Sequence, residues 1–351
     1  MEDPTPVFAS NMNNKRLGFL SFGHWHRDSA GRPDAAAALQ DTVQMAVDAE
    51  AAGLDDAWIR VHHFQRMISS PFPLLAAMAA RTERIHLGTG VIDLRYENPL
   101  YFAEAAATAD LIAAGRLELG VSRGSPEAAR DGQEQFGYTL AEGESWASVA
   151  WQRGERIRTA LRGTPLAQPD LESGWSHTTG MLRIEPQSPG LADRLWWGAG
   201  STPTAVRAGE AGYDLVSSTL LLEDDGRPFH VQQADQVARY REAFAAAGHE
   251  RTPHTAVTRS ILAIQDEQDE RRFGHERHGR DSSGFLDGSR AVSGPTYAGT
   301  PEEVAELLAK DEAVQAADLV LVANPSTLGA AYNAKQFAGW MESWRLLGWA
   351  D

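Results

Sequence analysis

No cysteine occurs among the 351 residues of the chain. Disulfide bonds, thiolate catalysis and cysteine-ligated zinc are therefore excluded. Long apolar runs are also missing, because no stretch approaches the roughly 18 consecutive apolar residues that a membrane span needs. The N-terminal stretch lacks the basic-then-apolar order of a signal peptide. From these absences we expect a cytoplasmic protein without a membrane-spanning segment.

Positive charge is scarce as well. The chain has 32 Lys and Arg residues against 48 Asp and Glu residues, which gives a formal net charge of −16. Nucleic-acid backbones and anionic membrane surfaces bind clustered Lys and Arg side chains. A charge balance of this sign argues against nucleic acids and membranes as partners. The hydrophobic fraction of 42% is that of an ordinary globular protein.

The pattern of apolar residues predicts eight units, each made of a strand followed by a helix. The expected strands are 17–22, 56–61, 85–92, 117–122, 195–200, 213–218, 255–264 and 318–323. Successive units of this kind imply parallel strands joined by right-handed crossovers. An α/β chain of this length fits a closed (β/α)8 TIM barrel best, forming a single domain over residues 1–351. A doubly wound open sheet is the alternative.

Two segments interrupt the succession of strands and helices. Residues 163–194, after the fourth helix (146–161), contain several Gly and Pro residues and predict a hairpin excursion. Residues 266–299, after the seventh strand, are first charged and then rich in Gly and Ser. A long polar segment at this end of a barrel is either a lid over the site or a loose loop.

In a barrel of this kind, the chemistry lies at the carboxyl ends of the strands. Neighbouring strand residues point to opposite faces, so His62 and His63 are not expected to act as a simple pair. The rule selects the polar and glycine residues that follow the expected strands: His24 and His26, His62 and His63, Gly90 to Asp93, Arg123, Gly200 to Thr202, Ser217 and Ser218, and Asn324.

A metal site is the first possibility, because His24 and His26 directly follow the first strand. Metal-dependent hydrolase barrels place an HxH pair there. A zinc site needs three or four protein ligands. The fifth, sixth and eighth strands end in Gly200, Ser218 and Asn324, which supply neither His nor carboxylate ligands. We therefore expect no metal site, and a metal-dependent hydrolase is the least favoured function.

An anion site is the second possibility. Gly200-Ser201-Thr202-Pro203-Thr204 leads from the fifth strand into a helix, whose first backbone N–H groups attract anions. The same residues also fit an ordinary helix start with Ser201 as the N-cap. Arg123, at the end of the neighbouring fourth strand, favours a phosphate clamp, because a guanidinium binds phosphate through two hydrogen bonds. A salt bridge to a barrel carboxylate is the alternative for Arg123.

Glycines lie next to two of these candidates. Gly124 beside Arg123 would let a ligand approach the backbone closely. The glycine-rich end of the third strand, Gly88-Thr89-Gly90, leaves room for a flat ligand or an unusual backbone conformation. Taken alone, the glycines of the third strand are better explained by tight packing at the barrel rim.

Four sequence landmarks occur together in register. They are His62-His63-Phe64 after the second strand, Gly88-Thr89-Gly90-Val91 after the third, the turn Asn98-Pro99, and the segment from Gly115-Arg116 to Arg123-Gly124. Their order and spacing resemble the bacterial luciferase-like family of flavin-dependent monooxygenases. The resemblance extends from Leu17 to about Trp344.

The resemblance implies a role for particular residues of this chain. Arg123, Ser201, Thr204 and the backbone of Gly200 would hold the phosphate of FMN. The peptide bond between Gly90 and Val91 would be cis and lie under the flavin ring, which Ser218 would approach from another side. His62 would be the acid/base residue, and His63 would pack between the barrel and its helices. Many members have Glu where this chain has Val61, which would remove a polar neighbour from the pocket and leaves the exact reaction open.

The resemblance also implies a function. The chain would use reduced FMN and O2 to oxidise a small organic substrate. A separate reductase would supply the reduced FMN, because no GxGxxG nucleotide fingerprint appears. An F420-dependent hydride-transfer oxidoreductase and a non-catalytic flavin-binding protein are the alternatives. Members of the family often form homodimers through the helices beside strands two and three, where alanine-rich stretches 74–80 and 103–114 permit close packing.

Overall fold

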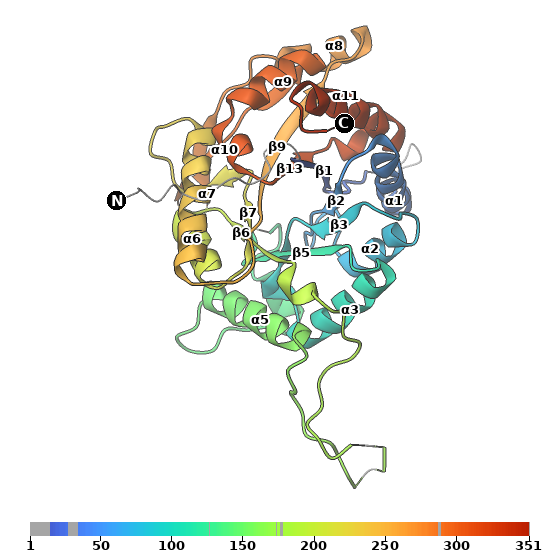
Figure 1. Ribbon diagram of the computed structural model, residues 1–351, viewed down its shortest axis with the longest axis vertical. Helices are drawn as coiled ribbons and strands as arrows, with labels where there is room; N and C mark the ends of the chain where they lie inside the picture. Colours follow the sequence, from blue (N-terminus) through green and yellow to red (C-terminus); the bar gives the residue numbers. More distant parts are fainter. Residues whose placement is uncertain are drawn as a thin grey trace, which may run out of the picture.

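The computed structural model describes residues 15–26, 34–125, 127–172, 174–175, 178–286 and 289–350. Eight parallel strands form a closed barrel (Figure 1), because β1 pairs with both β2 and β13. The predicted (β/α)8 barrel is confirmed, and the open sheet is excluded. The barrel strands are β1 (Arg16–Ser21), β2 (Asp56–Ile59), β3 (His86–Thr89), β5 (Leu117–Ser122), β6 (Leu195–Ala199), β7 (Asp214–Ser217), β9 (Thr255–Ala263) and β13 (Leu319–Ala323).

Helices surround the barrel on its outer side (Figure 1). The main ones are α1 (Ala35–Ala52), α2 (Pro71–Ala79), α3 (Pro99–Ile112), α5 (Trp146–Leu161), α6 (Thr202–Glu210), α7 (Phe229–Ala246), α9 (Pro301–Lys310) and α11 (Ala330–Leu346). Shorter helices are α4 (Gly132–Gln135), α8 (Glu267–Phe273) and α10 (Glu312–Ala316). No helix of the described residues is long and apolar enough to cross a membrane.

The expected strand 85–92 is divided in the structure. β3 ends at Thr89, the peptide bond between Gly90 and Val91 is cis, and a short strand β4 (Ile92–Asp93) follows. β4 pairs with β5 beyond the point where β3 stops. The predicted cis bond is therefore present in the described backbone.

Two tryptophans fill the lumen, the interior space enclosed by the eight strands. Trp58 and Trp196 meet edge to face with 5.4 Å between ring centroids, packed among Leu20, Val216 and other apolar side chains. Gly88 gives them room, because a Cβ at that position would lie 2.4 Å from the Trp58 indole. Packing therefore explains this glycine, and the tryptophan pair forms a floor beneath the carboxyl ends of the strands.

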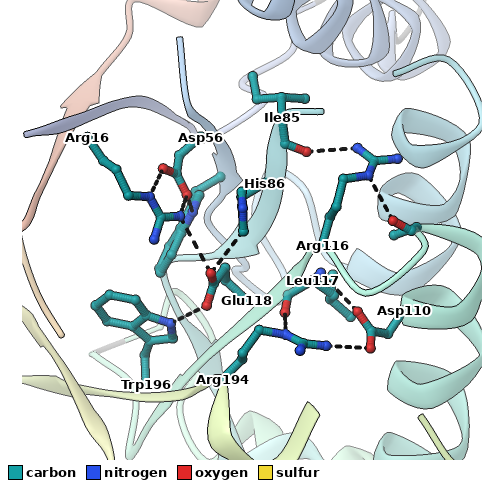
Figure 2. A network of polar contacts seen from close by, with 12 residues as sticks. Arg16, Asp56, Ile85, His86, Asp110, Arg116, Leu117, Glu118, Arg194 and Trp196 are labelled. Carbon is teal, nitrogen blue, oxygen red and sulfur yellow. Dashed lines mark hydrogen bonds and ion pairs between the residues drawn. The ribbon is translucent and has the colours of Figure 1, made fainter. Parts of the chain in front are cut away.

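A network of polar contacts around two buried carboxylates, Asp56 and Glu118, lies at the opposite, amino end of the strands (Figure 2). Arg16 donates to Asp56 at 2.8 Å, and Glu118 accepts from the Trp196 indole N–H at 2.8 Å. His86 Nδ1 lies 3.1 Å from Glu118. Burial raises the pKa of Asp56. Burial would also raise the pKa of Glu118, but the hydrogen bond with His86 and the charge of Arg16 hold it below its usual value.

The two segments outside the regular succession differ in structure. The described parts of the segment 163–194 run away from the barrel beyond α3 and α5 (Figure 1), and contain an isolated antiparallel bridge between Ala167 and Leu182. Residues 266–299 contain α8 and then three strands: β10 (Ser282–Leu286), β11 (Ser289–Ser293) and β12 (Thr296–Gly299). β11 pairs with β8 (Leu220–Leu221), and β12 pairs with β9. The second segment is thus attached at the carboxyl end of β7.

Candidate active site

The residues after β2 continue the strand alternation for a few positions. Trp58 points into the lumen, whereas Ile59 and Val61 pack in the outer core between barrel and helices. The Arg60 N–H still donates to Ser21 O at 2.8 Å, and its guanidinium lies 5.6 Å from the centre of the Phe22 ring. Phe22 packs against the lumen cluster. Arg60 therefore lies on the lumen side, and the expectation that Val61 faces the pocket is wrong.

His62 is buried, with both ring nitrogens bound within the protein. Its Nε2 accepts a hydrogen bond from Arg60 Nε at 3.0 Å, so Nδ1 carries the hydrogen. Nδ1 donates to Glu127 Oε1 at 3.0 Å, and Gln65 donates to the other Glu127 oxygen at 2.8 Å. Burial would raise the pKa of Glu127, but these hydrogen bonds from His62 and Gln65 outweigh it and lower the pKa. The result is a continuous chain from a carboxylate through an imidazole to a guanidinium.

His63 has different surroundings from His62. Its ring stacks on Tyr96 with 4.2 Å between centroids and meets Phe136 edge to face at 5.2 Å. Burial lowers the pKa of His63, which favours the neutral ring. The predicted packing role of His63 is confirmed, and so is the separation of the two histidines.

The start of α6 holds an anionic group. Ser201 is the N-cap residue of this helix, as the ordinary helix-start alternative predicts, but its side chain makes no capping hydrogen bond. Instead, Thr202 N–H donates to the Glu223 carboxylate at 3.0 Å, and the Ser201 and Thr204 hydroxyls lie 2.9 Å apart. A backbone N–H and two hydroxyls are donors that suit a phosphate as well as a carboxylate. The residues present therefore fit the phosphate group of a cofactor.

Arg123 lies at the same edge of the barrel. β5 and β6 are neighbours with Val121 opposite Trp197, so Arg123 and Ser201 both leave the carboxyl ends of adjacent strands. Arg123 is exposed to solvent. Gly124 has φ 85°, and a Cβ there would lie 2.0 Å from an Asp93 oxygen. The close approach that Gly124 permits in the structure is thus to Asp93, and its use by a ligand stays a prediction.

The remaining predicted cofactor residues lie near the ends of β3, β6 and β7. Val91 follows the cis bond. Its side chain lies close to Gly198, because a Cβ placed at Gly198 would be 3.1 Å from it. Ser218 N–H donates to Ala199 O at 3.2 Å, so Ser218 lies beside the end of β6. At Gly200 a Cβ would meet only ordinary contacts with Leu222, at 3.6 Å. The structure thus brings these backbone segments to one side of the barrel.

The histidines after β1 do not build a metal centre. The described residues contain no group of three or more His, Asp or Glu side chains placed to hold a metal ion. His24 stacks on Phe22 with 5.4 Å between centroids. Burial lowers the pKa of His24, and the nearby His26 and His62 lower it further. Asn324 donates to Met45 Sδ and to Asn333, which makes it a packing residue.

A cavity of about 470 Å³ adjoins the site between α1 and α2. Its lining is mostly apolar and includes Trp25, Leu39, Met67 and Leu74. Gln65 also lines it, and the same side chain donates to Glu127. Gln65 therefore connects the hydrogen-bonded chain of Glu127, His62 and Arg60 to a mostly apolar cavity.

A comparison with protein families decides the assignment. The family model described as luciferase-like monooxygenase matches residues 16–330. The chain belongs to the luciferase-like monooxygenase family. The match includes the site residues from Phe22 to Glu223, and the predicted resemblance is confirmed.

Two curated relatives of this luciferase-like chain are uncharacterised. The protein YwcH of Bacillus subtilis is 25% identical over 243 residues, which is 69% of this chain and 67% of YwcH. The protein y4vJ of Sinorhizobium fredii is 26% identical over 193 residues, which is 53% of this chain and 51% of y4vJ. The matches thus span about half to two thirds of these relatives.

Solved structures share the fold of the luciferase-like chain at low identity. The oxygenating constituent of 3,6-diketocamphane monooxygenase from Pseudomonas putida, in complex with FMN, has a TM-score of 0.66 at 17% identity, covering 93% of this chain and 96% of its own. An F420-dependent secondary alcohol dehydrogenase has a TM-score of 0.62 at 12% identity, covering 94% and 99%. Members of the fold with either cofactor are therefore similar to this chain.

Four residues of the site were missed from the sequence: Arg60, Gln65, Glu127 and Glu223. Arg60 lies two positions before His62, so the strand alternation could have placed both on the lumen side. No sequence signal identifies Glu127, which lies 65 residues from His62 in another loop. In a luciferase-like barrel, such contacts form only when the loops of different strands meet at one end.

Proposed function

We propose that this luciferase-like chain is an FMN-dependent monooxygenase that uses reduced FMN and O2 to oxidise a small organic substrate. The observation that carries the proposal is the start of α6, where the Thr202 N–H donates to the Glu223 carboxylate and the Ser201 and Thr204 hydroxyls lie 2.9 Å apart. A phosphate of FMN would take the place of the Glu223 carboxylate. Arg123 on the adjacent strand would add charge-assisted hydrogen bonds.

The flavin ring would lie toward the side of Gly90, Val91 and Ser218. When bound, reduced FMN supplies the activation of O2, and the protein supplies position and proton transfer. The floor of Trp58 and Trp196 would exclude water from below. His62 would exchange a proton through Nε2 while Glu127 holds Nδ1. The segment 266–299 is the candidate lid, because β11 is attached through β8 next to the site.

Two protein partners belong to the proposal. The diketocamphane relative is named an oxygenating constituent, which supports a separate reductase as the source of reduced FMN. A second copy of this chain is the other partner. Tyr101 on α3 is 75% exposed and Ile112 is 50% exposed, beside a groove of about 560 Å³ between α2 and α3. Large exposed apolar side chains of this kind are typical of an interface.

An F420-dependent oxidoreductase is the second candidate, and the likeness to the alcohol dehydrogenase structure favours it. F420 also carries a phosphate, so the start of α6 and Arg123 would serve both cofactors. Both candidates place the same residues at the same end of the barrel.

The phosphate clamp is tested by replacing Arg123 with Ala. We expect FMN to bind about 10–100 times more weakly, because one or two charge-assisted hydrogen bonds of about 1.5–3 kcal/mol are lost. Riboflavin, which has no phosphate, should bind with unchanged affinity. Flavin fluorescence titration measures both. Arg66→Ala, at an exposed arginine after β2, is the control and should leave both affinities unchanged. Equal losses for FMN and riboflavin would show that Arg123 does not meet the phosphate.

A further inference from the structure

Arg60 places a guanidinium inside the carboxyl end of the barrel. Its backbone N–H extends the strand ladder to Ser21, and its side chain lies over the ring of Phe22, above the tryptophan floor. Arg60 is partly buried. A buried guanidinium is costly unless an anion balances its charge.

The hydrogen bonds of this guanidinium go to neutral acceptors. Arg60 Nε donates to His62 Nε2 at 3.0 Å and NH2 donates to Ser125 Oγ at 3.3 Å. Among the residues that the structure describes, no carboxylate forms an ion pair with Arg60. Two other arginines pair with carboxylates instead. Arg259 meets Asp311 at 2.6 Å and Arg95 meets Asp93 at 2.6 Å.

The two carboxylates whose charges act on Arg60 are already hydrogen-bonded to other side chains. Glu127 accepts from His62 and Gln65 through its two oxygens, and Asp93 accepts from Arg95 through both of its own. The charges of Glu127 and Asp93 act on Arg60, but burial outweighs them and lowers its pKa. The guanidinium thus has donors left over for an anion that enters the site.

We infer that Arg60 binds a carboxylate of the substrate, so that the substrate of this chain is a small organic anion. The inference rests on the proposed function for the reaction, but the binding itself needs no flavin. The planar guanidinium presents paired N–H groups whose spacing matches the two oxygens of a carboxylate. The apolar cavity next to Gln65 offers space for an uncharged part of such a molecule.

A carboxylate at this position would also act on His62. A carboxylate that binds on the Nε side of the guanidinium would compete with His62 Nε2 for the Arg60 Nε–H, because both are acceptors at the same donor. Release of that hydrogen bond would leave Nε2 available for proton exchange with the bound substrate. Glu127 would continue to hold Nδ1 and so fix the orientation of the ring.

The test uses matched pairs of probes on the purified full-length protein without flavin. Acetate, hexanoate and benzoate are each titrated against the corresponding amide, with tryptophan fluorescence and calorimetry as readouts. We expect at least one carboxylate to bind roughly tenfold or more tightly than its amide. Arg60→Gln should abolish that preference, and Arg60→Lys should keep part of it. Arg66→Gln, which removes an exposed arginine of the same loop, should leave the preference unchanged. Circular dichroism checks that each variant is folded.

Two results would overturn the inference. The first is that the wild-type protein binds no carboxylate more tightly than its amide, or that Arg60→Gln and Arg66→Gln lose the preference for the carboxylate equally. The other is a loss of affinity for reduced FMN in Arg60→Gln while oxidised FMN binds normally, since the anionic flavin ring would then be the partner of Arg60. Failure of FMN to bind at all, with the carboxylate preference intact, would reject the proposed function and leave the anion site in place.

Discussion

Replacing His62 with Ala is expected to lower turnover by about 10²–10⁴-fold, the range that a positioned acid/base residue contributes. FMN should still bind, because the proposed phosphate site at α6 and Arg123 lies on other strands. A substrate is first selected by screening carboxylic acids with reduced FMN. Turnover is then measured by mass spectrometry as the amount of product formed from that acid. His26→Ala is the matched control, because His26 is an exposed histidine at the same end of the barrel.

The surroundings of His62 explain the size of this effect. Glu127 holds Nδ1 at 3.0 Å, so Nε2 is the ring nitrogen left to exchange a proton once Arg60 releases it. Glu127→Gln should give a smaller loss of turnover than His62→Ala, because the amide can still accept from Nδ1. Turnover that is unchanged in His62→Ala would remove His62 from the reaction.

Replacing Glu118 with Ala is expected to lower the free energy of unfolding by about 3–5 kcal/mol, because it removes one partner from a buried charge network. The Trp196 indole N–H and His86 would each lose their acceptor, and Arg16 would keep only Asp56 (Figure 2). Guanidinium denaturation followed by tryptophan fluorescence measures the change.

The matched control for Glu118 is an exposed carboxylate. Glu267 on α8 has a side chain that is 95% exposed and pairs with Arg271 one turn later. Glu267→Ala should change the free energy of unfolding by about 0–1 kcal/mol, as is usual for surface ion pairs. Similar losses for Glu118→Ala and Glu267→Ala would mean that the network at the amino end of the barrel does not stabilise the fold.

Most of the barrel could be predicted from the sequence. The expected strand 117–122 coincides with β5, and 255–264 exceeds β9 by one residue. Strands of a parallel barrel are buried on both faces, so they appear as continuous apolar runs bounded by polar residues. The prediction of the third strand was less accurate. Its break at Gly90 leaves no mark in the apolar pattern, and only the family resemblance predicted the cis bond there.

The site was predicted only in part, for a physical reason. His62, Arg123 and Ser201 each follow a strand, and the barrel rule places the end of every strand at the same edge. Their partners come from loops, whose course the apolar pattern does not determine. Glu223, which follows β8 and accepts from Thr202 N–H, and Glu127 beside His62 were therefore missed. Val61 was assigned to the wrong side, although the strand alternation that separates His62 from His63 would have corrected it.

The identity of the cofactor is the central claim, and anaerobic equilibrium dialysis tests it most directly. Purified protein is dialysed in parallel against reduced FMN and against F420. We predict that reduced FMN binds roughly tenfold or more tightly, a difference of about 1.4 kcal/mol. The net charge of −16 disfavours the additional carboxylates of the F420 tail. Tighter binding of F420, or binding of neither cofactor, would contradict the proposed FMN-dependent monooxygenase.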